Sequence, residues 1–313
     1  MSSSYVAVFP GQGSQRVGML AAAAESNPTV NELFARASEV LGYDLWALSQ
    51  HGPQEELNLT ETTQPLILTA SVAIWQIWRA NGAPAPEFMA GHSLGEFSAL
   101  VCADSLEFED AVALVRNRGR YMQTAVPVGV GSMAAILGLD DETIAQACAV
   151  AAQGEVVEAV NLNAPGQVVI AGHASAVERA IEECKSRGAK RAMPLPVSAP
   201  FHTSLMQPAG EQLAGDLSSM RIRAPSIPVI HNVHAEPEQD PERIRSLLTK
   251  QIHSPVQWVR SMQYARQQGV SSGVEIGPGK VLSGLCKRIE RDFEGLSTEE
   301  PADLAKSLDA VKG

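Results

Sequence analysis

The sequence has little of what nucleic-acid-binding and membrane proteins require. Aromatic residues make up 5% of its 313 residues, no run of Lys or Arg is longer than two, and the formal net charge is -11. An acidic chain without a basic stretch is poorly suited to a phosphate backbone, so we expect no nucleic-acid partner. The longest apolar stretch, Pro65–Trp78, is interrupted by polar residues and is too short to cross a bilayer. We therefore expect no membrane contact and interpret this stretch as a buried helix.

The chain also lacks the cysteine pattern of a metal-binding or disulfide-stabilised protein. Its cysteines are far apart and form no Cys-x-x-Cys pair: Cys102, Cys148, Cys184 and Cys286. Such spacing argues against a zinc site and against structural disulfides, so we expect no metal, and reduced thiols in a cytoplasm. The first basic residue is Arg16, and residues 1–9 predict a strand rather than a signal or transit peptide.

The amino-acid pattern that is present favours an α/β fold. Hydrophobic residues form 45% of the chain, enough to bury a large core. Tyr5–Phe9 is continuously apolar and runs into Pro10–Gly13, which is typical of a buried parallel strand that ends in a tight loop. Helical segments follow at Val30–Leu41 and Pro65–Trp78. Strands alternating with helices predict a parallel sheet covered by helices, here an α/β-hydrolase-like domain.

A different rhythm between residues 127 and 196 predicts a second, smaller unit. Its elements are expected in the order strand, helix, strand, strand, helix, strand, with strands at Met133–Leu137, Val156–Asn161, Gln167–Ala171 and Arg191–Leu195. This βαββαβ order is ferredoxin-like. We therefore predict an inserted ferredoxin-like subdomain of residues 127–196 and a catalytic domain of residues 1–126 and 197–313.

Two finer predictions concern the insert and the C-terminal tail. Ser175 and Glu178 have the spacing of a capping box, and Gly188 is placed to end the same helix. After Arg291 the chain is polar, and Glu299–Pro301 predicts a surface connection before a last short helix.

The motif Gly-x-Ser-x-Gly at Gly91–Gly95 is the most informative feature of the chain. In this pattern a serine is exposed on a sharp strand-to-helix turn. The mostly apolar run Glu87–Ala90 and the amphipathic run Glu96–Ala103 supply the expected strand and helix. Ser93 is therefore the candidate nucleophile, and a chance pentapeptide in a turn is the alternative.

A serine nucleophile needs a base and donors for an oxyanion. Among the seven histidines, His202 lies where the chain re-enters the larger domain, in the kind of loop that places catalytic groups. An ordinary loop histidine fits the same position. The backbone N–H of Leu94 is the usual first oxyanion donor, and the loop around Gln12 is a candidate for the second. A plain tight turn is the alternative for that loop.

Helix geometry brings Arg118 near Ser93. The helix after Ser93 and an antiparallel return helix over Glu109–Gln123 have a similar rise, so Arg118 comes back to about the level of the serine. A guanidinium there suits an anionic acyl group, because its planar fork binds a carboxylate through two parallel hydrogen bonds. The neighbours Arg116 and Arg120 also fit a solvated helix face, which is the alternative.

Six short motifs carry a family resemblance, and they occur in this order: FPGQGSQ (Phe9–Gln15), GHSLGE (Gly91–Glu96), NRG (Asn117–Gly119), NLNAPGQVVIAG (Asn161–Gly172), SAPFH (Ser198–His202) and EIGPGKVL (Glu275–Leu282). Together they closely resemble the family of bacterial malonyl-CoA:acyl-carrier-protein transacylases, over about residues 5 to 290. The resemblance implies an enzyme that loads malonyl groups from malonyl-CoA onto acyl carrier protein for fatty-acid synthesis. It also implies a cytoplasmic protein that is usually a monomer and needs no cofactor.

The resemblance assigns roles to the candidate residues. It implies that Ser93 is the acylated nucleophile and that His202 is its general base. It implies that the backbone carbonyl of Gln251 orients the histidine, where many serine enzymes use an acid. The backbone amides of Gln12 and Leu94 match the oxyanion hole.

The resemblance also implies a choice of acyl group. Arg118 matches the arginine that pairs with the malonyl carboxylate. Leu94 after the serine and Phe201 before the histidine match residues that accompany malonyl rather than methylmalonyl transfer in related polyketide acyltransferases. Their bulk would meet a 2-methyl branch, and such discrimination is worth about 1 to 3 kcal/mol per methyl-sized group.

Several alternatives stay open at the level of sequence. A serine hydrolase would have the same elbow, although no acidic third member is identifiable; a catalytically idle acyl-binding scaffold, a methylmalonyl- or acetyl-selective transferase and a role in polyketide synthesis are others. An acidic carrier protein needs a local basic patch on this acidic chain. The candidates are Lys185, Arg187, Lys190, Arg191, Lys280, Lys287 and Arg288.

Overall fold

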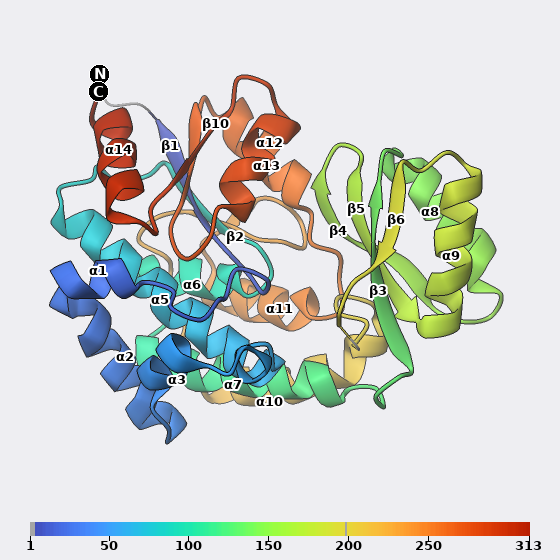
Figure 1. Ribbon diagram of the computed structural model, residues 1–313, viewed down its shortest axis with the longest axis horizontal. Coiled ribbons are helices and arrows are strands. Elements are labelled where there is room, and N and C mark those ends of the chain that lie inside the picture. Colours follow the sequence, from blue (N-terminus) through green and yellow to red (C-terminus); the bar gives the residue numbers. More distant parts are fainter. Residues whose placement is uncertain (1–3, 198) are drawn as a thin grey trace.

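Two β-sheets organise the chain, and helices pack around each of them (Figure 1). The computed structural model describes residues 4–197 and 199–313. Residues 1–3, which begin the expected N-terminal strand, and Ser198, the first residue of the SAPFH motif, lie outside the described residues.

The larger sheet is built mainly from parallel strands. Within the described residues it has six strands, in the order β10 (Glu294–Ser297), β9 (Ser272–Glu275), β1 (Tyr5–Phe9), β2 (Phe88–Gly91), β7 (Val229–Ile230) and β8 (Pro237–Glu238). Neighbours run parallel from β10 to β7, and β8 pairs antiparallel with β7. Because Phe9 lies beside Gly91 in the register, the loops that follow β1 and β2 emerge side by side at one edge of the sheet.

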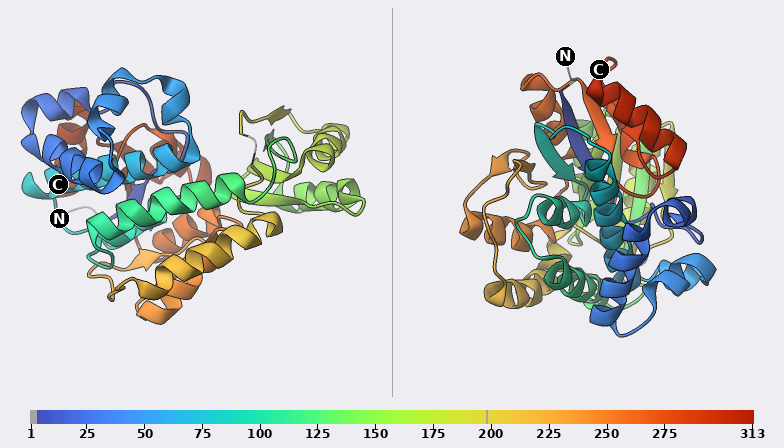
Figure 2. Two further views of the ribbon diagram at one scale, coloured as in Figure 1. Left: turned by 90° about the horizontal axis from the view of Figure 1, so that it is seen from below. Right: turned by 90° about the vertical axis from the view of Figure 1, so that its left-hand side faces the viewer.

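Helices cover both faces of this sheet (Figure 2). Side chains of β1 alternate between two apolar clusters, with Tyr5, Ala7 and Phe9 in one and Val6 and Val8 in the other. A strand covered on both faces must be apolar throughout, and the predicted parallel strand is confirmed. The first cluster is completed mainly by α2 (Pro28–Leu41), α5 (Thr60–Ala80), α6 (Gly95–Cys102) and α7 (Phe108–Thr124), and the second by α12 (Trp258–Gln267) and α13 (Val281–Ile289).

The predicted buried helix at Pro65–Trp78 is confirmed and extends over all of α5. None of the helices in residues 4–197 and 199–313 has the length and hydropathy needed to cross a lipid bilayer. The remaining elements around the larger sheet are α1 (Ala21–Ser26), α3 (Leu45–His51), α4 (Gln54–Leu57), the 3-10 turn Ser204–Met206, α10 (Gln207–Ser219), α11 (Pro241–Gln251) and α14 (Pro301–Lys312).

The smaller sheet is antiparallel and has the predicted ferredoxin-like order. Its strands are β3 (Gly131–Leu137), β4 (Val157–Ala164), β5 (Gln167–His173) and β6 (Arg191–Pro194), arranged as β4-β5-β3-β6. The helices α8 (Asp141–Ala152) and α9 (Ala174–Ser186) pack on it and close a separate apolar cluster. The predicted fold class, a parallel α/β sheet with a ferredoxin-like insert, is confirmed.

The capping-box prediction for α9 was wrong. Strand β5 runs directly into the helix, so His173 is the N-cap residue and Ser175 already lies inside the first turn. The Ser175 hydroxyl donates instead to the carboxylate of Glu155, at 2.8 Å. The expected end is confirmed, because Gly188 adopts a φ of 94° and its N–H donates to the carbonyl of Lys185.

The predicted surface connection before a last helix is only partly confirmed: Pro301 is exposed and begins α14, but Glu299 is buried. Strand β10 pairs in parallel with β9 and extends the larger sheet. Glu299 is only 4% exposed, and its carboxylate accepts hydrogen bonds from Arg16 at 2.5 Å and from the N–H of Gly279 at 2.8 Å. These partners are distant in sequence, so local polarity carried no sign that the glutamate would be buried.

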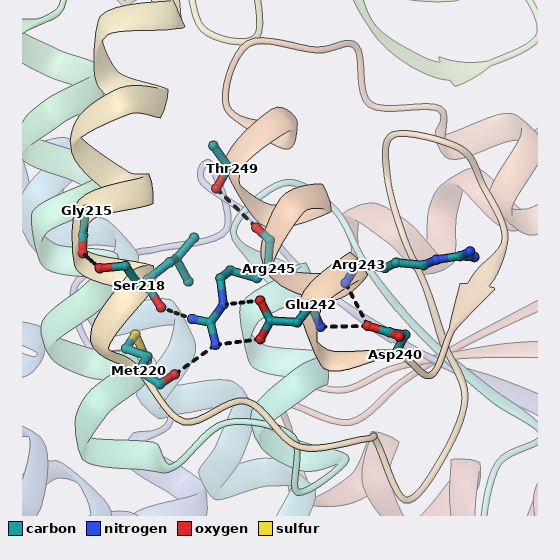
Figure 3. A network of polar contacts seen from close by, with 9 residues as sticks. Gly215, Ser218, Met220, Asp240, Glu242, Arg243, Arg245 and Thr249 are labelled. Atoms are coloured by element: carbon teal, nitrogen blue, oxygen red, sulfur yellow. Dashed lines mark hydrogen bonds and ion pairs between the residues drawn. The ribbon is translucent and has the colours of Figure 1, made fainter.

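Helix α11 is held firmly at its beginning, which sets the position of Gln251 at its end. The carboxylate of Asp240 accepts from the backbone N–H groups of Glu242 and Arg243, at 2.8 and 3.1 Å, and caps the helix (Figure 3). Arg245 donates to backbone carbonyls at the end of α10, including that of Met220 at 3.2 Å. The first half of α11 is therefore anchored to a neighbouring helix.

The turn between β2 and α6 is packed too closely for side chains at its two glycines. A Cβ on Gly91 would lie 1.8 Å from the backbone carbon of Gly95. A Cβ on Gly95 would lie 2.0 Å from the carbonyl oxygen of Phe9 on β1. Helix α6 can therefore begin against the sheet only because both positions are glycine.

Replacing Gly95 should test this close approach. We expect Gly95→Ala to lower the free energy of unfolding by about 1 to 3 kcal/mol or more, because backbone must move to admit the methyl group. Gly215→Ala in α10 is the matched control, since nothing lies within 4 Å of its added Cβ. The control should be neutral or stabilising by up to about 1 kcal/mol in urea unfolding. Equal effects of the two substitutions would contradict the packing argument.

Candidate active site

Ser93 occupies a strained turn between β2 and α6. Its φ of 52° lies in the left-handed region that L side chains rarely adopt. The side chain of Asn232 holds the turn through two hydrogen bonds. Its Oδ1 accepts from the Ser93 N–H at 2.8 Å, and its Nδ2 donates to the Gly91 carbonyl at 2.6 Å. The predicted strand-turn-helix context of the serine is therefore present, with the hydroxyl at the end of the larger sheet.

The imidazole of His202 contacts the serine hydroxyl. Ser93 Oγ lies 2.7 Å from His202 Nε2, and His202 Nδ1 lies 2.9 Å from the backbone carbonyl oxygen of Gln251. A carbonyl can only accept, so Nδ1 carries the proton and Nε2 is free to accept from Ser93. Burial, together with the nearby positive charge of Arg118, lowers the pKa of His202 from 6.5 to about 3. The ring is therefore a neutral base at ordinary pH.

Arg118 is a buried cation beside the Ser93 hydroxyl. It comes from α7, is 1% exposed, and its NH2 group donates to Ser93 Oγ at 3.1 Å. The NH1 group donates to Gln64 Oε1 at 2.8 Å, and NH2 also donates to Gln251 Oε1 at 2.7 Å. Burial lowers the pKa of Arg118 to about 10, so the guanidinium stays charged at neutral pH. The alternative of a solvated helix face does not hold for this side chain.

A cavity of about 140 Å³ opens onto Ser93, His202 and Arg118. Gln12 and Leu94 lie in its wall, on the neighbouring loops after β1 and β2. In the part of the chain that the structure describes, the backbone N–H groups of these two residues donate to no other protein group. The other lining residues include Phe201 and residues from the side of the smaller sheet: Met133, Asn161, Leu195 and Val197.

The structure thus brings the sequence-predicted residues together. Ser93, Arg118, His202 and the loops of Gln12 and Leu94 meet at one cavity, and Phe201 lines it. Gln251 does not line the cavity, but it accepts hydrogen bonds from Arg118 and His202, which do. His92 also lines the cavity, and its Nε2 lies 2.8 Å from Asn163 Oδ1 rather than bonding to Ser93. This arrangement places a serine hydroxyl beside a neutral imidazole, two N–H groups and a buried guanidinium.

Comparison with known proteins agrees with this chemistry. A family model described as the acyl transferase domain matches residues 6–305 of the chain. The chain belongs to the acyl transferase family.

This acyl transferase is similar along its whole length to proteins named malonyl CoA-acyl carrier protein transacylase. It is 56% identical to that of Escherichia coli (strain K12) over 307 residues, which cover 98% of this chain and 99% of the relative. It is 45% identical to that of Bacillus subtilis (strain 168), with coverage of 97% and 96%. The resemblance drawn from the six motifs is confirmed.

Solved structures agree equally well. The malonyl CoA-acyl carrier protein transacylase of Coxiella burnetii superposes with a TM-score of 0.99 at 49% identity, covering 100% of this chain and 99% of the other. A type II PKS acyl-carrier protein in complex with its malonyl-transacylase gives a TM-score of 0.97 at 52% identity, with coverage of 98% and 99%.

Sequence reasoning missed three buried polar residues of this acyl transferase site. Gln64 and Asn232 hold Arg118 and the Ser93 turn, and Glu96 accepts a hydrogen bond from Gln251 at 2.9 Å. Gln64 stands at the edge of the apolar stretch of α5, where a polar side chain was a usable signal. Glu96 belongs to the GHSLGE motif, but its short helix is buried on every side. The sequence offered no sign of that complete burial.

Because the pKa of His202 is low, we predict that Ser93 stays reactive as the pH falls well below neutral. Protonation at Nε2 would remove the base, and this occurs only near the folded-state pKa of about 3. The second-order rate constant for labelling Ser93 with a fluorophosphonate, followed by intact-protein mass, should stay flat from about pH 8 to about pH 5. In Arg118→Ala, which removes a nearby positive charge, the fall should begin at a higher pH. A wild-type profile that titrates at the ordinary pKa of histidine would contradict the burial argument.

Proposed function

We propose that this acyl transferase moves the malonyl group of malonyl-CoA to the phosphopantetheine thiol of acyl carrier protein, through a malonyl ester on Ser93. One observation carries the proposal: the charged group of Arg118 lies 3.1 Å from the serine hydroxyl and is buried. An acyl group that ends in a carboxylate would pair with this cation while its thioester carbonyl reaches Ser93. The names of the relatives support the same substrates.

In the first half-reaction Ser93 attacks the thioester carbonyl of malonyl-CoA. His202 Nε2 takes the hydroxyl proton as the oxygen-carbon bond forms. The N–H groups of Gln12 and Leu94 would hold the resulting oxyanion, and loss of one such donor typically costs about 2.7 to 4 kcal/mol of transition-state stabilisation. Collapse of the tetrahedral intermediate breaks the carbon-sulfur bond, and His202 returns the proton to the departing coenzyme A thiolate.

The second half-reaction runs through the same groups. The phosphopantetheine thiol gives its proton to His202 and attacks the malonyl ester. The same two N–H groups hold the oxyanion, and Ser93 leaves with the proton that the histidine carries. The carbonyl of Gln251 keeps the imidazole in the required tautomer through both halves, because it accepts only from Nδ1–H.

The acyl preference follows from charge first and bulk second. An acetyl group would leave the buried charge of Arg118 without its carboxylate partner, which penalises acetyl transfer. Leu94 and Phe201, which are 1% and 8% exposed, are positioned at the cavity wall where a 2-methyl branch would need room. We therefore propose malonyl selectivity over both acetyl and methylmalonyl groups.

Only some of the seven candidate basic residues remain available to an acidic carrier protein. Three of the seven candidates pair with carboxylates of this chain: Lys185 with Glu182, Arg187 with Glu183, and Lys280 with Asp303. We place the acidic carrier against the other four, which are Lys190, Arg191, Lys287 and Arg288. Arg288 also donates to Gln167 at 2.5 Å and so links α13 to the smaller sheet.

We further propose that the enzyme acts as a cytoplasmic monomer and needs no cofactor. The nucleophile, base, oxyanion donors and cation all come from one chain, so one copy holds a complete site. The reaction is an acyl transfer in which serine is the nucleophile and histidine carries each proton between the reacting groups. We also propose the domain limits of residues 127–196 for the insert, with residues 1–126 and 197–313 forming the catalytic domain.

Intact-protein mass after brief mixing with malonyl-CoA or acetyl-CoA tests the proposal directly. The wild type should gain a malonyl adduct, and Ser93→Ala should gain none. Arg118→Ala should lose the malonyl adduct without a loss of acetyl labelling, because only malonyl uses the cation. Ser98→Ala is the matched control, since Ser98 is a buried serine on α6, the helix that follows Ser93, and should keep the adduct.

Other outcomes of this experiment would point to the alternatives. Equal labelling by the two thioesters would contradict the role of Arg118. An adduct that water removes faster than holo-acyl carrier protein does would indicate a hydrolase. No adduct in the wild type would indicate an acyl-binding scaffold.

The bulk argument predicts a shift of selectivity in Phe201→Ala. Removal of the ring opens space beside the acyl group, so the ratio of kcat/KM for methylmalonyl-CoA to that for malonyl-CoA should rise by about tenfold or more. Leu195→Ala, at another part of the same cavity wall, is the control for a general loosening of the pocket. A ratio that rises equally in both variants would contradict a specific role for Phe201.

A further inference from the structure

Arg118 is buried without a carboxylate of its own. Its NH1 and NH2 groups donate to the neutral oxygens of Gln64, Gln251 and Ser93. The guanidinium also lies over the ring of Phe97, 5.2 Å from its centroid. Within residues 4–197 and 199–313 no Asp or Glu oxygen forms a salt bridge with it. A buried cation in such surroundings needs compensation from charge placed further away.

Glu96 is a buried carboxylate that can compensate the charge of Arg118 from a distance. It lies in the first turn of α6, is 0% exposed, and its carboxylate accepts three hydrogen bonds. The donors are His231 Nδ1 at 2.7 Å, the backbone N–H of Asn232 at 2.9 Å and Gln251 Nε2 at 2.9 Å. Burial opposes ionisation of Glu96, but the adjacent His231 and these hydrogen bonds hold the pKa of the carboxyl below its ordinary value. Glu96 is therefore charged.

The side-chain amide of Gln251 bridges the two charges. Its Nε2 donates to Glu96 and, at 2.9 Å, to the Ser93 carbonyl, while its Oε1 accepts from Arg118 at 2.7 Å. A flipped amide would set N–H against the guanidinium and oxygen against the carboxylate. Both charges thus favour the same orientation, and the amide dipole transmits the attraction between them in a low-dielectric interior.

An indirect ion pair has a functional advantage over a direct one. A carboxylate bound directly to Arg118 would occupy the two-pronged fork that an acyl carboxylate needs. With one amide in between, the cation is compensated while its NH2 group still faces Ser93.

We propose that Glu96 is a positioning residue, which fixes the Gln251 side-chain amide and thereby holds the Arg118 guanidinium ready for the carboxylate of the substrate. This inference rests on the proposed function, because it assumes that Arg118 binds the acyl carboxylate. His202 is held by the backbone carbonyl of Gln251 and not by its side chain, so the effect of Glu96 falls on acyl selectivity rather than on the base.

The test is the ratio of kcat/KM for malonyl-CoA to that for acetyl-CoA in Glu96→Gln. We expect the ratio to fall by about tenfold or more, which corresponds to about 1.4 kcal/mol of transition-state binding. The ratio does not depend on the fraction of folded enzyme, so partial loss of fold leaves the test valid. Glu275→Gln, which removes another fully buried carboxyl, at the end of β9, is the matched control and should keep the wild-type ratio.

The double variant Glu96→Gln/Arg118→Ala separates the possible failures. If Glu96 acts through Arg118, the double variant should have the ratio of Arg118→Ala alone. A ratio unchanged in Arg118→Ala would overturn the proposed carboxylate pairing. A ratio that collapses in Arg118→Ala but stays at the wild-type value in Glu96→Gln would overturn this inference and leave the proposed function intact. Should Glu96→Gln give no folded protein, Glu96→Asp replaces it, with a smaller fall expected because the charge is kept.

Discussion

The side-chain amide of Gln251 is held between a buried cation and a buried anion, and the geometry of the site depends on that contact. Its oxygen contacts Arg118, its nitrogen contacts Glu96, and its own backbone carbonyl orients His202. Because the amide is shielded from water, these hydrogen bonds are stronger than they would be at a surface. Gln251 is the last residue of α11, so the Asp240 cap and the Arg245 contacts with α10 contribute to the placement of His202 and Arg118, which they do not touch.

Burial affects the two ionisable groups of the site in one direction but with opposite consequences. It lowers the pKa of His202 to about 3 and that of Arg118 to about 10. The first change makes the histidine a neutral acceptor at the pH of a cell, whereas the second leaves the arginine charged. One buried environment therefore leaves the imidazole neutral and the guanidinium charged, because the two groups start from very different ordinary pKa values.

Ser93 and His202 both adopt a strained backbone conformation. Ser93 and His202 have φ values of 52° and 65°, and a non-glycine residue in that region costs on the order of 1 to 3 kcal/mol. Side-chain hydrogen bonds from Asn232 hold the serine turn, and the Gln251 carbonyl holds the histidine ring. Strain at both partners of one hydrogen bond is typical of a site in which the fold places the reacting atoms.

Features with a local or periodic physical cause could be predicted from the sequence. The parallel strand at Tyr5–Phe9, the elbow at Ser93 and the return of Arg118 to the level of the serine follow from strand burial, glycine sterics and the constant rise of a helix. The predictions of a capping box at Ser175 and of an exposed Glu299 were wrong. Each side chain bonds to a partner that the fold brings close but that is distant in sequence: Glu155 for Ser175 and Arg16 for Glu299.

The fold class, the family and the candidate serine could all be recognised without the structure, since short motifs and hydrophobic periodicity act over a few residues. The buried polar groups that support the site could be identified only from the packed fold. Glu96, Asn232 and Gln251 are separated by up to 155 positions, yet each hydrogen bond among them is 2.9 Å long. Partners of this kind are chosen by how sheet and helices pack, because a buried polar group must be satisfied by whatever the fold brings within reach.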